Sequence, residues 1–117
     1  MVIKCTLSII PENIGHYARQ SWGLPPLPGF ITKMGPYVNE QAGGDNQIVT
    51  IFDFEKSRFR EAWECISEQL DVFRIIPGVT LSVHIMEKGR EVKGYRISWN
   101  QPSANPDAHS HLKSAIL

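Results

Sequence analysis

The sequence predicts a single α+β domain in which two helices cover one face of a four-stranded antiparallel sheet. Apolar and polar residues alternate in segments 2–10 and 79–86, which is the pattern of strands with two different faces. Between them, apolar residues recur at spacings of three and four over residues 56–75, which is the pattern of an amphipathic helix. Glycine and proline clusters separate these segments and mark the turns.

The first half of the chain supplies a strand, a helix and an interrupted strand. In segment 2–10, apolar side chains alternate with Lys4, Thr6 and Ser8. Pro11 ends this strand, and Asn13 is placed to cap a helix over residues 13–22. A proline-rich connection follows at 23–29. Gly35 and Pro36 then interrupt segment 30–41, so we expect a strand that is broken, bulged or at a sheet edge.

The second half supplies a hairpin, the long helix and a last strand. A glycine-rich turn at 43–46 leads into a strand over 47–54, rich in β-branched and aromatic residues. The helix over 56–75 ends before Pro77 and Gly78, and a strand over 79–86 ends at a turn over 88–90. We therefore expect one domain over 1–95. Residues 96–117 are expected to form a tail whose apolar end can dock on a partner subunit.

The composition is that of a folded domain without a charged partner. The chain has 117 residues, enough for one hydrophobic core but not comfortably for two. Its lysines and arginines number 12, as do its aspartates and glutamates, so no net field attracts nucleic acid or anionic lipid. No run approaches the roughly 18 apolar residues of a membrane helix. We expect neither nucleic acid nor a membrane as a partner.

The cysteines and the opening segment indicate a cytoplasmic protein. Segment 2–10 contains Lys4 and lacks both a basic leader and a small-residue cleavage site, so it is expected to be a strand and not a signal peptide. Cys5 and Cys65 have neither metal-type nor redox-type spacing. In a reducing compartment both are expected to remain thiols, buried as small apolar residues.

The order strand, helix, strand, strand, helix, strand is that of a ferredoxin-like βαββαβ sandwich. One face of its sheet lacks helices, and the set Lys4, Thr6, Ser8 and His84 is expected there because the alternating apolar set packs under the helices. We also expect Met86, Thr50 and Phe52 on this open face. Because such a face is only partly polar, we expect a second copy of the chain to cover it, giving a homodimer.

These residues carry a resemblance to the dimeric α+β barrel superfamily, over roughly residues 1–95. The resemblance rests on the element order, on the hairpin through Val49–Asp53, and on the junction Phe73, Arg74, Ile75, Ile76, Pro77, Gly78, Val79 and Thr80. It implies a dimeric barrel. Proteins of that fold include cofactor-independent quinol monooxygenases, haem-degrading enzymes, polyketide cyclases and stress-responsive proteins.

The sequence lacks two features of proteins with this fold, and each absence argues against one function. Haem-degrading members carry a histidine ligand on the second helix, and residues 56–75 contain no histidine. RNA-binding relatives need a basic, aromatic signature on the central strand, where segment 47–54 offers only Phe52 and Phe54. We expect no cofactor and no RNA.

His84 is the leading catalytic candidate, because an imidazole on a barrel strand can exchange a proton near neutral pH. Tyr37 is the second, as a group that orients a substrate. The sequence also offers five candidates for ligand binding near the first strand and the first helix: His16, Tyr17, Trp22, Thr6 and Ser8. For each of these residues, ordinary packing or hydrogen bonding is the alternative role.

Two hypotheses about function remain open. One is a cofactor-independent enzyme of the monooxygenase, cyclase or isomerase type, acting on a small, partly apolar substrate. The other is a non-catalytic dimer that binds a small molecule or another protein. His109 and His111 form an H-x-H pair, but a metal site needs a third ligand and none is spaced nearby, so we expect no metal.

Overall fold

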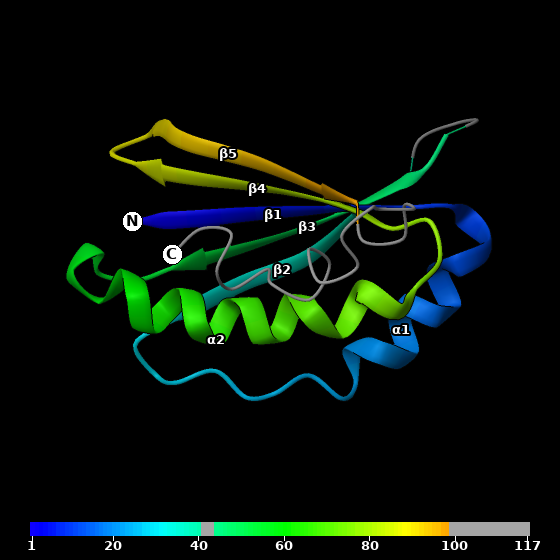
Figure 1. The fold of residues 1–117 in the computed structure, drawn as a ribbon, viewed down its shortest axis with the longest axis horizontal. Helices are drawn as coiled ribbons and strands as arrows, with labels where there is room; N and C mark the ends of the chain where they lie inside the picture. Colours follow the sequence, from blue (N-terminus) through cyan, green and yellow to red (C-terminus); the bar gives the residue numbers. More distant parts are fainter. Residues whose placement is uncertain (41–43, 99–117) are drawn as a thin grey trace, which may run out of the picture.

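The computed structural model describes residues 1–40 and 44–98, and these form one sheet with two helices (Figure 1). The elements in chain order are β1 Val2–Ile9, α1 Ile14–Ser21, β2 Thr32–Asn39, β3 Asn46–Asp53, α2 Phe59–Asp71, β4 Thr80–Glu87 and β5 Arg90–Ser98. Short 3₁₀ helices precede α1 and flank α2, at Pro11–Asn13, Lys56–Arg58 and Val72–Ile75. The strands lie in the order β2-β3-β1-β4-β5, and every neighbouring pair is antiparallel.

The prediction of a four-stranded ferredoxin-like sandwich is wrong, because the described part of the chain forms a five-stranded sheet. After β4, Lys88 and Gly89 adopt positive φ values of 53° and 79° and turn the chain back. The next residues pair with β4 along its length as the edge strand β5. A register shift between Ile85 and Met86 interrupts the alternation of side chains here. Most of β5 is also exposed, and its contribution to the core is limited to Tyr95 and Ile97 near its end.

The end of β5 changes the boundary of the expected tail. The strand continues through Ser98, so Arg96 and Ile97 belong to the sheet. The rest of the tail, residues 99–117, lies outside the described residues.

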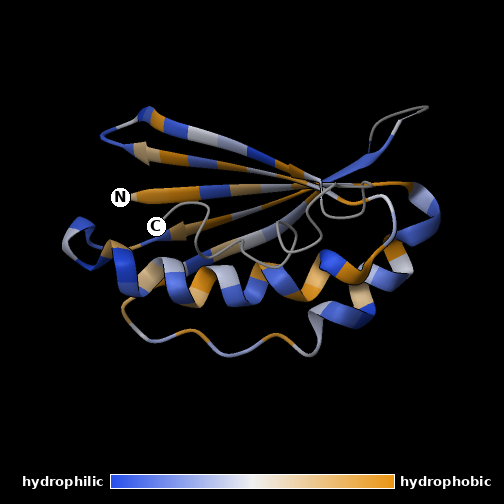
Figure 2. Cartoon of the chain, in the orientation of Figure 1, coloured by the Kyte–Doolittle hydropathy of each residue, from blue (hydrophilic) through white to orange (hydrophobic). Residues whose placement is uncertain are grey.

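The core lies between α2 and the inner face of the sheet, as the alternating pattern predicts. Ile3, Cys5, Leu7 and Ile9 of β1 are all at most 4% exposed. The residues opposite them on β4 are Ile85, Val83 and Leu81, which are also buried. From α2, the apolar stripe buries Ala62, Trp63, Ile66 and Leu70, and Phe73 continues it. Bands of hydrophobic and hydrophilic residues alternate along α2 and along the central strands (Figure 2).

The opposite face of the sheet, here called the outer face, carries both polar and apolar side chains. Strand register places Lys4, Thr6, Ser8 and His84 on it, as expected. The expectation for Thr50 and Phe52 is wrong: they pair with Cys5 and Ile3, so they point to the helices, and Phe52 is 1% exposed. Met86 does lie on the outer face, opposite Val2. The apolar members of this face are Val2, Met34, Tyr37, Val49, Ile51 and Met86.

The interruption predicted in segment 30–41 is confirmed and the capping role predicted for Asn13 is wrong; the predicted turn at 43–46 lies partly outside the described residues. β2 is an edge strand with a register shift between Met34 and Tyr37, where the sequence places Gly35 and Pro36. Asn13 occupies the cap position of α1, but its side chain makes no capping bond. Its Nδ2 instead donates to the carbonyl of Pro77 at 2.8 Å, which ties the start of α1 to the segment after α2. Figure 1 shows both helices on the same side of the sheet.

Candidate functional site

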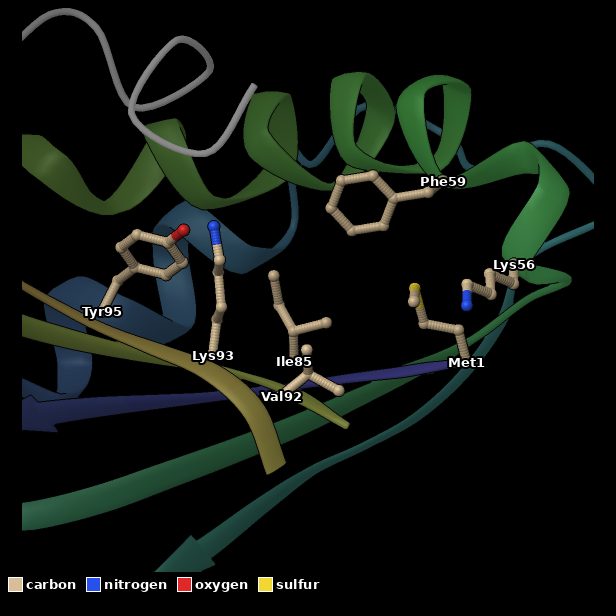
Figure 3. A pocket seen from close by; sticks show the side chains of 7 residues that line it. All are labelled: Met1, Lys56, Phe59, Ile85, Val92, Lys93 and Tyr95. Atoms are coloured by element: carbon tan, nitrogen blue, oxygen red, sulfur yellow. The ribbon is translucent and has the colours of Figure 1, made fainter. Parts of the chain in front are cut away.

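A pocket of about 320 Å³ opens between the start of α2 and the inner face of the β4–β5 edge (Figure 3). Seven residues line it: Met1, Lys56, Phe59, Ile85, Val92, Lys93 and Tyr95. Most of the lining is apolar, and its polar side chains are the amines of Lys56 and Lys93 and the phenol of Tyr95; the α-amino group of Met1 donates to the carbonyl of Phe54 at 3.0 Å. An apolar cavity with a few placed polar groups is the usual form of a small-molecule site.

The pairing of β4 with β5 places the strand residues of the pocket on the inner face, and the start of α2 supplies Phe59. Ile85 lies on the inner face of β4 and forms the floor of the pocket. Lys93 and Tyr95 pair with Ile85 and Val83, so both extend from β5 toward α2. Val92 occupies the register shift. Phe59 is the first residue of α2, and its ring extends from the helix into the pocket.

The two amines of the pocket have different surroundings. Lys56 Nζ donates to Glu87 Oε1 at 2.9 Å, and this hydrogen bond lowers the pKa of the Glu87 carboxyl. Lys93 has no carboxylate within ion-pairing distance among residues 1–40 and 44–98. Lys93 and Tyr95 lie two residues apart on the inner face of β5, and both side chains line the pocket (Figure 3). At one end of the pocket Lys56 is therefore paired with Glu87, whereas at the other the Lys93 ammonium has no carboxylate partner in the described part of the chain.

The outer face carries a second polar arrangement, between His84 of β4 and Glu91 of β5. Glu91 Oε1 contacts Nδ1 of His84. Gly94 lies opposite His84, and a Cβ there would meet Glu91 Oε1 at 3.0 Å and His84 Nδ1 at 3.5 Å. The missing side chain of Gly94 thus leaves room for the pair. A carboxylate on one ring nitrogen orients an imidazole and selects its tautomer, as in acid–base catalysis.

The other predicted residues of the outer face do not gather around His84. Tyr37 lies on β2, three strand spacings from β4, which is about 14 Å. It is 57% exposed. Ser8 donates to Asp45 Oδ2 at 3.3 Å, and Thr6 sits between Val49 and Ser82. These residues share a face with His84 but do not form one site within a subunit.

The candidates on the first helix lie on the other side of the sheet. Tyr17 is buried, which raises the pKa of its phenol, and its ring stacks on Phe73 with centroids 4.8 Å apart. Trp22 is 84% exposed, and His16 is half-buried. None of the three lines the pocket described above. Tyr17 therefore serves packing, and the structure brings none of them to His84.

A small internal cavity of about 20 Å³ lies under the sheet beside Lys33. Lys33 Nζ donates to Gln69 Oε1 at 3.1 Å, and Gln69 Nε2 donates to the carbonyl of Pro25 at 2.6 Å. Burial lowers the pKa of the Lys33 amine and raises that of the Cys5 thiol, which also lines this cavity. The volume suits about one water molecule. This chain of bonds fixes the 23–29 connection to α2 and is structural.

Sequence reasoning missed the pocket because five of its residues carried no signal of their own. Val92, Lys93 and Tyr95 belong to the unpredicted β5, and Phe59 and Ile85 were assigned to the core. Among the described residues, no group of three potential ligands could hold a metal ion. His109 and His111 lie outside the described residues.

Further observations bear on location and relatives. In the part of the chain that the structure describes, no helix has the length and apolar character needed to cross a membrane. Cys5 and Cys65 are not joined by a disulfide bond. Comparison with known proteins finds no match, whether among family models, curated proteins or solved structures.

Proposed function

We propose that this protein binds a small, mostly apolar molecule in the pocket between α2 and the β4–β5 edge. The observation that carries the proposal is the cavity itself, which is apolar, about 320 Å³ in volume and open to solvent at one side. Small-molecule sites are concave and mostly apolar, with a few polar groups that fix the orientation of the ligand. This volume equals that of about ten water molecules in the liquid, which suits a compact molecule with one ring or a short chain.

A neutral probe tests this function with a matched pair of variants. We expect 4-phenyl-1-butanol to bind the protein in a calorimetric titration. Val92→Trp fills the mouth of the pocket and is expected to weaken binding at least about tenfold, the equivalent of about 1.4 kcal/mol. Val38→Trp is the control, because Val38 lies on the opposite edge strand and both valines are 54% exposed. Absence of binding, or equal binding by the two variants, contradicts the proposal.

Proton transfer by His84 is the second candidate function, and the contact with Glu91 favours it. The carboxylate holds one ring nitrogen, which leaves Nε2 as the nitrogen that can reach a substrate. His84 lines none of the pockets described above, so this chemistry needs a ligand on the outer face. Turnover of a bound compound that survives His84→Ala in a folded protein contradicts this role.

We also propose that the protein is a homodimer that packs through the outer face. Support comes from the apolar group Met34, Tyr37, Val49 and Ile51, which the described helices leave uncovered. Ile51→Lys is expected to convert a dimer into a folded monomer in sedimentation experiments, whereas Ile10→Lys, at an exposed residue after β1, leaves the dimer intact. A wild-type monomer at micromolar concentration contradicts this assembly. We propose a cytoplasmic location as well, which is consistent with Cys5 and Cys65 not being joined in a disulfide.

A further inference from the structure

The charges around the pocket are unevenly matched. At one end, Lys56 is neutralised by Glu87 at 2.9 Å. At the other end, Lys93 meets no carboxylate among residues 1–40 and 44–98, although its side chain extends from the inner face of β5 over the apolar lining. The N-terminal ammonium of Met1 also acts on Glu87 and helps to lower the pKa of its carboxyl, so the Lys93 end is where a cation of the pocket lacks a carboxylate among the described residues.

We propose that the molecule bound here is a monoanion, with an apolar body and a single carboxylate that pairs with Lys93; this inference rests on the proposed function above. The apolar body lies on Ile85, Val92 and Phe59. The carboxylate lies at the β5 end, where the Lys93 ammonium and the Tyr95 hydroxyl both donate hydrogen bonds. A carboxylate has enough acceptor sites to accept from both at once.

The same arrangement selects against other ligand classes. A second anionic group at the far end of the pocket meets Glu87, whose carboxylate already occupies Lys56. A neutral ligand offers the Lys93 ammonium only an uncharged acceptor, which makes a weaker hydrogen bond than a carboxylate does. A cation meets Lys93 and Lys56 as like charges. The monoanion is the class that matches each end of the pocket.

A matched pair of probes tests the inference. In calorimetric titrations of the full-length protein, 4-phenylbutyrate is expected to bind about fivefold more tightly than 4-phenyl-1-butanol, the preference that one partly exposed ion pair supplies. The preference is expected to shrink as salt is added, because salt screens exposed charges.

Two charge-removing variants separate the pocket from general electrostatics. Lys93→Met is expected to keep the affinity for the alcohol and to lose the preference for the acid. Lys4→Met removes the same charge from the outer face and is expected to keep the preference. Equal affinities in the wild type, or a preference that persists in Lys93→Met, overturn the inference and leave the apolar site standing. Failure of both probes to bind overturns the proposed function together with the inference.

Discussion

Glu91 and His84 are joined side chain to side chain across the β4–β5 pair, with the carboxylate oxygen of Glu91 against Nδ1 of His84. The two residues are seven positions apart in the chain, and the tight turn at Lys88 and Gly89 brings them together. Gly94 provides the space for the contact. The catalytic candidate identified from the sequence therefore has a partner that the sequence did not indicate.

The contact makes a prediction about the tautomer of His84. Because a carboxylate only accepts hydrogen bonds, Nδ1 carries the proton and Nε2 is bare in the neutral ring. Long-range ¹⁵N correlation spectra at roughly pH 8.5, two units above the ordinary histidine value, measure this directly. We expect the Nδ1–H form to dominate in the wild type and to decline in Glu91→Ala. A ring protonated mainly on Nε2 in the wild type contradicts the contact.

Substitution by alanine is expected to lower the free energy of unfolding by different amounts at two glycines of the sheet, Gly35 and Gly94. Gly35 has φ of 99°, and a Cβ there would lie 2.7 Å from the backbone oxygen of Val49, which cannot move aside. Gly35→Ala should therefore lower the free energy of unfolding by at least about 2 kcal/mol. At Gly94 the nearest atom is the mobile end of Glu91, so Gly94→Ala should change stability by less than about 1 kcal/mol. Urea denaturation measures both, and equal effects contradict this account.

A pair of tryptophans, Trp63 and Trp22, provides a matched test of the core. Trp63 is fully buried on α2, whereas Trp22 is 84% exposed after α1. Trp63→Ala is expected to cost about 3–5 kcal/mol of unfolding free energy, through lost burial and the cavity left behind. Trp22→Ala is expected to cost less than about 0.5 kcal/mol. A large loss of stability on changing Trp22 means that something covers this residue in solution.

Asp71, the last residue of α2, predicts a specific dependence of stability on pH. Burial raises the pKa of its carboxyl, and Oδ1 is buried without a hydrogen-bond partner among the described residues. The folded protein thus binds this proton more tightly than the unfolded chain does. The group's contribution to stability is therefore greatest below the ordinary aspartate pKa, and it is lost as pH rises through the raised value.

Asp71→Asn removes this titration. At neutral pH the variant is expected to be more stable than the wild type by up to about 1 kcal/mol, a small value because the carboxyl is partly exposed and screened. The difference should shrink on acidification as the wild-type carboxyl becomes protonated. Thermal unfolding across the acid range measures it, and a constant difference is inconsistent with the raised pKa.

The strands and the helix that could be predicted from the sequence are those in which one side is buried along the whole element and the other side is not. Segments 2–10 and 79–86 alternate because one face is buried, and the helix over 56–75 shows its stripe because it lies flat on the sheet. β5 could not be found this way, since it is an exposed edge strand whose register shifts beside Val92. The bulge in β2 was foreseen because Gly35 and Pro36 mark it in the sequence.

Only part of the candidate sites could be predicted from the sequence, because the rest depends on β5, which was not predicted. His84 could be identified from its residue type and its place in a strand. Its contact with Glu91, and the pocket around Lys93 and Tyr95, both depend on β5 lying beside β4. The signal that could have located β5 is the turn at Lys88 and Gly89, followed by Val92, Tyr95 and Ile97.

The most direct test of the central claim is a methyl-resolved NMR titration of the wild-type protein with 4-phenyl-1-butanol. Each face of the sheet carries its own reporters: Ile85 and Val92 line the pocket, whereas Ile51 and Val49 lie on the outer face. Binding in the pocket predicts saturable shifts of the Ile85 and Val92 methyl signals, with those of Ile51 and Val49 unchanged. Shifts confined to Ile51 and Val49, or no saturable shift at all, would contradict a ligand site between α2 and the β4–β5 edge.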